Sequence, residues 1–183
     1  MSLIFRLVLF LHLIGVLGFV GLMWSFGIGL TRIQQFDNVE VVRSWVTMAR
    51  TCNRQASWFL LLLLVTGIFL TIQIQASHQA YIQMAVIFLI LMGALNGGGL
   101  GSWIKKGFRS LNSTTTGSLS TDQVALLRSK KIWVFYNSLR ALTLGAVLLM
   151  IDHPGFRGSI LLLIVSLVGG GLWTLGITFH KRS

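Results

Sequence analysis

The chain has 183 residues, of which 54% are hydrophobic and only 10% are charged, and its formal net charge is +11. Soluble domains carry about 25% charged residues, so this composition excludes an ordinary water-soluble fold. The excess of positive charge does not predict nucleic-acid binding, because the basic residues lie between apolar stretches, where they set membrane orientation and contact anionic lipids.

Five apolar stretches approach or exceed the roughly 20 residues that cross about 30 Å of hydrocarbon. Each is predicted to be helical, since a helix satisfies its own backbone hydrogen bonds where water is absent. We therefore expect an all-α integral membrane protein with a single transmembrane domain over residues 1–183. Its predicted spans are 3–30, 57–75, 81–104, 132–151 and 159–179.

The first span is predicted to stay in place as an anchor, because it lacks the basic n-region and the cleavage site of a signal peptide. It carries His12, about 13 Å along the helix from Leu3. A histidine inside a membrane indicates function by default, and a neutral imidazole is a common haem or metal ligand. Two other interpretations stay open, which are a single interhelical hydrogen bond and contact with a proton path or a quinone.

A cytoplasmic amphipathic segment is predicted before the second span. Asp37 and Glu40 fit the D-x-x-E capping box that begins a helix. The box opens the segment VEVVRSWVTMARTCNR (39–54), which we expect to lie on the cytoplasmic surface or rise from it.

Residues 105–122, between the third and fourth spans, are predicted to form a flexible cytoplasmic loop. Ser120 and Gln123 fit a second capping box, from which a helix is expected to continue through Arg128 into the fourth span. A turn at DHPG (152–155) is predicted to end that span.

The basic residues predict the orientation of the chain through the positive-inside rule. If five spans are correct, twelve Lys and Arg residues share one side: Arg32, Arg43, Arg50, Arg54, Lys105, Lys106, Arg109, Arg128, Lys130, Lys131, Lys181 and Arg182. The other side has only Arg6 and Arg157. We expect a protein of the bacterial inner membrane, with its N-terminus outside, its C-terminus in the cytoplasm and anionic lipids at its cytoplasmic face.

Two histidines fall in the predicted outer loops, His78 between the second and third spans and His153 between the fourth and fifth. Together with His12 they are the candidate metal ligands, because imidazole suits copper and haem iron. No pair of histidines at helical spacing within one span forms a metal site by itself.

Arg140 lies near the middle of the fourth span, where an arginine costs roughly 2.5–3.5 kcal/mol on insertion scales. No Asp or Glu lies inside any predicted span. The partner of Arg140 is therefore expected to be a backbone carbonyl, a lipid phosphate, a cofactor carboxylate such as a haem propionate, or another subunit. Tyr136 and Asn137 lie one turn away and are predicted to assist it. Alternatively, the side chain snorkels toward the inner surface.

Glycine is frequent in the first, third and fifth spans. Small residues let transmembrane helices approach closely, and they also admit a flat pigment or a lipid tail. We expect helix packing at Gly15, Gly18, Gly21, Gly97, Gly98, Gly99, Gly169, Gly170 and Gly171.

The opening HLIGVLGFVGLMW, the segment MARTCNRQASWFLLLLLVTGIFL and the stretch WIKKGFRSL resemble the copper-resistance protein D clan. That clan includes small membrane proteins of unknown function and membrane protoporphyrinogen oxidases. The resemblance places His12 at the first-helix histidine of the clan, a haem-ligand candidate in the oxidases, which leaves haem b open as one cofactor. The oxidases also carry polar, basic or His residues in their third helix. The third span here has neither His nor Lys, and a fifth span is extra, so oxidase activity is not implied.

Three functions remain open from the sequence. The first is a non-catalytic accessory, structural or assembly subunit of a respiratory or photosynthetic membrane complex, with other membrane subunits or further copies as partners. The second is a haem b- or copper-binding membrane protein that uses His12. The third is a small transporter, which only a weak internal repeat supports, relating GGGLGSW (97–103) to GGGLWTL (169–175).

Overall fold

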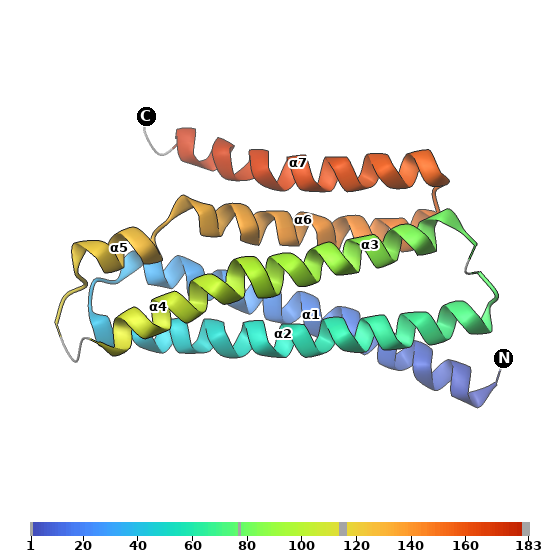
Figure 1. The fold of residues 1–183 in the computed structure, drawn as a ribbon, viewed down its shortest axis with the longest axis horizontal. Helices are drawn as coiled ribbons and strands as arrows, with labels where there is room; N and C mark the ends of the chain where they lie inside the picture. The colour runs from blue at the N-terminus through green and yellow to red at the C-terminus, as the bar shows by residue number, and fades with distance from the viewer. Residues whose placement is uncertain (1, 77, 114–116, 181–183) are drawn as a thin grey trace.

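The structure, a computed structural model, describes residues 2–76, 78–113 and 117–180. Within these ranges, five helical rods are long and apolar enough to cross a membrane, which confirms the predicted all-α fold with five candidate spans. The rods lie side by side along the long axis of the molecule (Figure 1). Their bounds are Leu3–Gln35, Val39–Gln73, Ala80–Asn112, Thr121–Asp152 and Phe156–Thr174.

The first two rods are single helices, α1 (Leu3–Gln35) and α2 (Val39–Gln73), joined by a short connection. The predicted amphipathic segment 39–54 is therefore the first part of α2 and not a separate surface helix. The 35 residues of α2 correspond to about 50 Å, well beyond the roughly 30 Å of a hydrocarbon layer. One end of this helix consequently extends past the apolar layer.

The third rod is continuous but changes its winding. It consists of α3 (Ala80–Ala94), a seven-residue π-helix (Leu95–Gly101) and α4 (Ser102–Asn112). The predicted flexible loop 105–122 is therefore helical as far as Asn112, because α4 buries Trp103, Ile104 and Leu111 along one face. Residues 114–116 of that loop, like Lys181 and Arg182, lie outside the described residues.

The fourth rod is divided into α5 (Thr121–Leu127) and α6 (Lys130–Asp152), and it is followed by α7 (Phe156–His180). The capping box at the start of α5 is confirmed, since Gln123 N donates to Ser120 Oγ at 3.3 Å and Ser120 N donates to Gln123 Oε1 at 3.0 Å. The predicted continuous helix instead breaks at Arg128. There the hydroxyl of Ser129 begins a new helix by accepting from Lys131 N.

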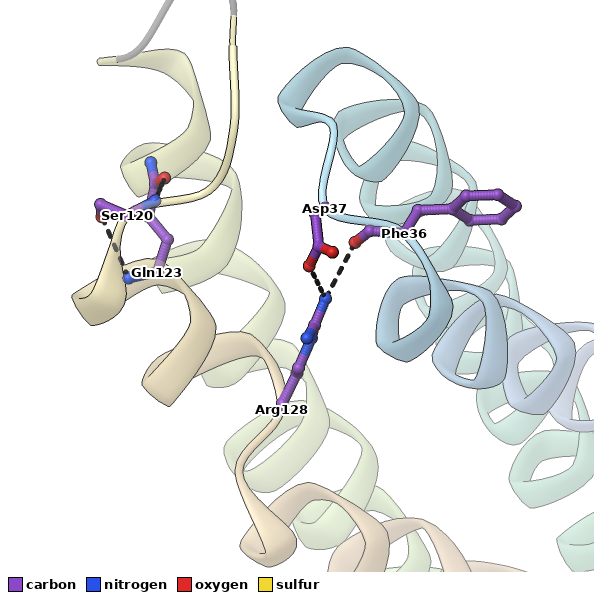
Figure 2. Close-up of polar contacts among 5 residues, drawn as sticks. All are labelled: Phe36, Asp37, Ser120, Gln123 and Arg128. Carbon is purple, nitrogen blue, oxygen red and sulfur yellow. Dashed lines mark hydrogen bonds and ion pairs between the residues drawn. The ribbon is translucent and has the colours of Figure 1, made fainter.

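The predicted box at Asp37 is displaced by one residue. Asn38 caps α2, and its Oδ1 accepts from the backbone N–H groups of Glu40 and Val41 at 2.9 and 3.2 Å. Asp37 instead forms an ion pair of 2.6 Å with Arg128, which also donates to the carbonyl oxygen of Phe36 at 3.0 Å (Figure 2). The α1–α2 connection is thereby tied to the α5–α6 break.

These connections and α4 gather at one end of the bundle, and the N-terminus lies at the other (Figure 1). Ten basic residues lie in α4, in the connections, or in the parts of α1, α2 and α6 nearest this end: Arg32, Arg43, Arg50, Arg54, Lys105, Lys106, Arg109, Arg128, Lys130 and Lys131. We call it the basic end. The structure thus groups the inner loops predicted from the sequence at one end of the molecule.

The core is built from facing helix surfaces. α1 packs along α2, α3 lies against both α2 and α6, and α7 covers the outside of α6 (Figure 1). Phe19, Phe26, Phe88, Leu139 and Leu142 are fully buried between them. α1 and α6 make only slight contact, so the bundle is less closed along that seam than elsewhere.

Candidate functional site

Arg140 lies in the middle of α6, ten residues after Lys130 and twelve before Asp152. These separations correspond to about 15 and 18 Å along the helix, so an α6 that crosses a hydrocarbon layer of about 30 Å would hold the Cα atom of Arg140 near mid-depth. The guanidinium carbon of Arg140 lies 4.9 Å from the ring centre of Trp24 and 5.5 Å from that of Tyr136. Both distances are within the range of cation–π attraction, which lowers the cost of holding this charge in an apolar layer.

Tyr136 fixes the place where α6 crosses α1. Its hydroxyl donates a hydrogen bond of 3.1 Å to the carbonyl oxygen of Met23, and its ring lies 5.9 Å from that of Phe26. Gly27 leaves room for the phenol, because a Cβ atom there would overlap the phenol oxygen. The crossing places Tyr136 beside Arg140, as the sequence predicted for this residue.

Asn137 does not accompany Arg140. Its Nδ2 donates to Thr174 Oγ1 on α7 at 3.0 Å, and the Thr174 hydroxyl donates to the carbonyl of Gly170 at 3.2 Å. Adjacent positions on an α-helix point about 100° apart, so Tyr136 faces α1 while Asn137 faces α7. Asn137 is therefore part of the α6–α7 contact.

A cavity of about 60 Å³ opens beside the guanidinium, between α1 and α6. Six residues line it, and we call them the Arg140 groove: Val20, Met23, Trp24, Arg140, Thr143 and Leu144. Its volume is far below the roughly 300–1,000 Å³ of pockets that hold drug-sized ligands. Trp24 is 61% exposed, so the groove opens toward the outside of the bundle.

No acidic side chain of this chain lies at the depth of the groove. The four acidic residues all lie at helix ends or in connections: Asp37, Glu40, Asp122 and Asp152. The nearest along α6 is Asp152, about 18 Å from Arg140 by helix rise. The groove therefore presents a cation at mid-depth with aromatic neighbours and without a carboxylate.

His12 lies where α1 packs on α2. Its Nδ1 is 2.8 Å from the hydroxyl of Thr66, which itself donates to the carbonyl of Leu62 at 2.6 Å. If the single proton of the Thr66 hydroxyl stays with Leu62, Thr66 accepts from His12 and Nδ1 carries the hydrogen, whereas a hydroxyl turned toward His12 makes Nδ1 the acceptor. In the first arrangement Nε2 is the acceptor nitrogen, which is the form of imidazole that binds metals. Trp24 lies twelve residues farther along α1, or about 18 Å, so His12 and the Arg140 groove are separate places.

The two histidines of the predicted outer loops, His78 and His153, form no three-ligand metal site with His12 in the described part of the chain. His153 ends α6 in a left-handed backbone conformation with φ of 47°, and its ring packs edge-on against Tyr81 with centres 4.6 Å apart. His78 lies in the connection between α2 and α3. Among the described residues, no group of three or more His, Cys, Asp or Glu side chains is arranged to hold a metal ion.

The predicted packing glycines divide into two groups. A Cβ atom would meet another helix closely at four of them: Gly15, Gly18, Gly99 and Gly170. At the other five it would have no neighbour within 4 Å in the described part of the chain: Gly21, Gly97, Gly98, Gly169 and Gly171. The described residues therefore give this second group no packing partner within the molecule.

The sequence did not predict three residues that contact Arg140, Tyr136 and His12. Trp24 meets Arg140, Gly27 admits Tyr136, and Thr66 orients His12. Their roles depend on which positions of two distant helices face each other, and no pattern within one span gives that register.

Comparisons of the chain with protein-family models, characterised proteins and solved structures give no match.

Proposed function

We propose that the protein is a non-catalytic accessory subunit of a larger membrane complex of the respiratory or photosynthetic type. The observation that carries this proposal is a face of small residues on the third rod, formed by Gly93, Ala94, Gly97 and Gly98. All four are exposed, and a Cβ atom at any of the three glycines would have no neighbour within 4 Å among the described residues. We call it the glycine face.

Exposed glycine in a helix has a cost that needs a compensating contact. Glycine inside a helix is less favourable than alanine by about 0.5–1 kcal/mol. In membranes, small residues four apart let a second helix come close enough for its backbone to pack against them. Since none of the described residues covers the glycine face, it is suited to a helix of another subunit.

The proposal is tested by extracting the protein from its native membranes in mild detergent and measuring the size of its assembly. We expect an assembly much larger than the 20.3 kDa chain with its detergent. Gly97→Leu fills the glycine face and is expected to release a folded chain. Gly21→Leu makes the same change at an outward glycine of α1 and is the matched control. A wild-type chain that is extracted as a monomer would refute the accessory role.

We further propose that the basic end faces the cytoplasm of a bacterial inner membrane. The excess of Lys and Arg at that end supports this orientation through the positive-inside rule. Gln79→Cys is expected to react with a membrane-impermeant thiol reagent added outside whole cells, and Thr121→Cys only after the cells are opened. The single native cysteine, Cys52, is buried and gives a low background. The reverse labelling pattern would refute the orientation.

A second candidate function is binding of haem b through His12. The observation that favours it is the hydrogen bond between His12 Nδ1 and the Thr66 hydroxyl, because a partner on one ring nitrogen fixes the ring and, when Nδ1 carries the hydrogen, leaves Nε2 as the ligating atom. The cavity beside Arg140 is too small for a macrocycle.

An absorption spectrum of the purified protein tests this candidate. A Soret band that is lost in His12→Ala and weakened in Thr66→Val would support haem ligation. His153→Ala, which removes a histidine from an outer loop, is the matched control and is expected to leave the band unchanged. A colourless protein after haem addition would reject the candidate.

A further inference from the structure

We propose that the Arg140 groove seats a transmembrane helix of a different protein, through an Asp or Glu side chain that this helix carries at mid-depth. The inference rests on the proposed accessory role and names the chemistry of the partner. It uses a different surface from the glycine face, because the groove is formed by α1 and α6.

The charge of the groove selects an anion. Arg140 is half-buried, and the cation–π contacts with Trp24 and Tyr136 leave its charge without a carboxylate from this chain. A planar guanidinium pairs with a carboxylate through two parallel hydrogen bonds, and these are stronger in a low-dielectric layer than in water. An acidic group is therefore the natural occupant.

The size and the lining of the groove select a side chain over a cofactor. About 60 Å³ accommodates a carboxyl group with its adjacent methylene groups but not a haem. The remaining lining, which includes Val20 and Leu144, is apolar and suits the surface of a hydrophobic helix. Trp24 is exposed beside the arginine, and Trp and Arg are the residue types that contribute most to protein interfaces.

The depth of Arg140 argues against a lipid headgroup. Phosphates, and the carboxylates of free fatty acids, lie at the membrane surface, about 15 Å from the centre of the hydrocarbon layer. A carboxylate is held at mid-depth when a transmembrane helix carries it there, and such residues pair with other polar groups. The groove therefore fits an intramembrane Asp or Glu.

A second copy of these 183 residues cannot supply that group. Their four acidic residues, Asp37, Glu40, Asp122 and Asp152, all lie at helix ends or in connections. A symmetric pair would also bring two arginines toward each other in an apolar layer, which is unfavourable. The partner is consequently a different protein.

Synthetic transmembrane peptides test the inference. The protein is reconstituted in phosphatidylcholine vesicles with a fluorescent label at Gln79→Cys, and its association with labelled Leu-rich peptides of about 20 residues is measured by energy transfer. The peptides differ at one central position, which is Glu, Gln or Leu. We expect the Glu peptide to bind about five- to thirtyfold more tightly than the Leu peptide, from the strength of interhelical polar contacts.

Variants of the protein show whether the preference for the Glu peptide depends on Arg140. Arg140→Gln is expected to abolish the preference for Glu, and Arg140→Lys to retain part of it. Arg6→Gln removes a charge near the start of α1 and is the matched control. Circular dichroism checks that the variants are folded. If Arg140→Gln misfolds, an Arg140→Glu variant that prefers a central-Lys peptide supports the site, and one without that preference overturns it.

Two results would overturn the inference. One is equal binding of the three peptides, or a Glu preference that survives Arg140→Gln in a folded protein. The other is displacement of the Glu peptide by oleate or by phosphatidylglycerol in the vesicles, which would assign the groove to an anionic lipid. If the native assembly depends on Gly97 while the peptides bind alike, the accessory role stands and this contact is rejected. A monomer in native membranes rejects the accessory role, whatever the peptides do.

Discussion

Three consecutive glycines of α7 allow a matched test of the packing described above. Gly170 faces α6, where a Cβ atom would lie 2.6 Å from Ser138 Cα and 2.8 Å from the carbonyl oxygen of Asn137. Gly169 and Gly171 have no neighbour within 4 Å of that position among the described residues. We therefore expect Gly170→Ala to destabilise the protein and the same change at either neighbour not to.

The magnitude follows from the displacement that alanine requires. The opposing atoms are backbone and cannot rotate away, so α7 has to move outward by about 0.8 Å to restore ordinary contact at 3.4 Å. A gap of 0.5–1 Å forfeits roughly a quarter to a half of the dispersion energy between facing atoms. The Asn137–Thr174 hydrogen bond, now 3.0 Å, would lengthen to about 3.8 Å and be lost, at about 0.6 kcal/mol.

Together these effects predict that Gly170→Ala is about 1–3 kcal/mol less stable than Gly169→Ala and Gly171→Ala, the usual cost of overpacking. The intrinsic helix preference of alanine is common to all three variants and cancels. The measurement is equilibrium unfolding in mixed detergent micelles, followed by circular dichroism. Equal stability of the three variants would refute the assignment of Gly170 to the α6–α7 contact.

Three further substitutions test how much individual contacts contribute to the stability of the folded protein. Gly27→Ala should destabilise the protein by about 1–3 kcal/mol, because the added Cβ would displace the phenol of Tyr136. In a protein that also carries Tyr136→Leu, Gly27→Ala should have no such cost. An unchanged cost in that background would contradict this account. Asp37→Asn should cost less than about 1 kcal/mol in the same unfolding assay, and less again at high salt, because its side chain is 73% exposed and its ion pair with Arg128 is screened. Asn96→Leu should cost about 1 kcal/mol, because it removes the hydrogen bonds that Nδ2 donates to Ser57 Oγ at 2.9 Å and to the carbonyl of Asn53 at 3.3 Å, while it also removes an Oδ1 that is buried without a partner among the described residues. A loss of several kcal/mol would contradict this offset.

The amino-acid sequence was sufficient for the class of protein and for the number of its candidate spans. Apolar runs of about 20 residues define helices independently of their neighbours, because an isolated chain segment in lipid has to satisfy its own backbone. The capping box at Ser120 was likewise readable, since it joins residues only three apart. Where two capping residues competed, at Asp37 and Asn38, the outcome depended on Arg128 from a distant part of the chain.

The candidate sites needed the tertiary structure. His12 and Arg140 stand out in the sequence because polar residues are rare in such spans, but their partners Thr66 and Trp24 are ordinary residues of other helices. The rotation of each helix about its axis decides which of these positions face each other, and composition does not set that rotation. Only the packing of the helices separates Gly170, which touches α6, from the outward Gly169 and Gly171. The same packing leaves the charge of Arg140 facing an open groove.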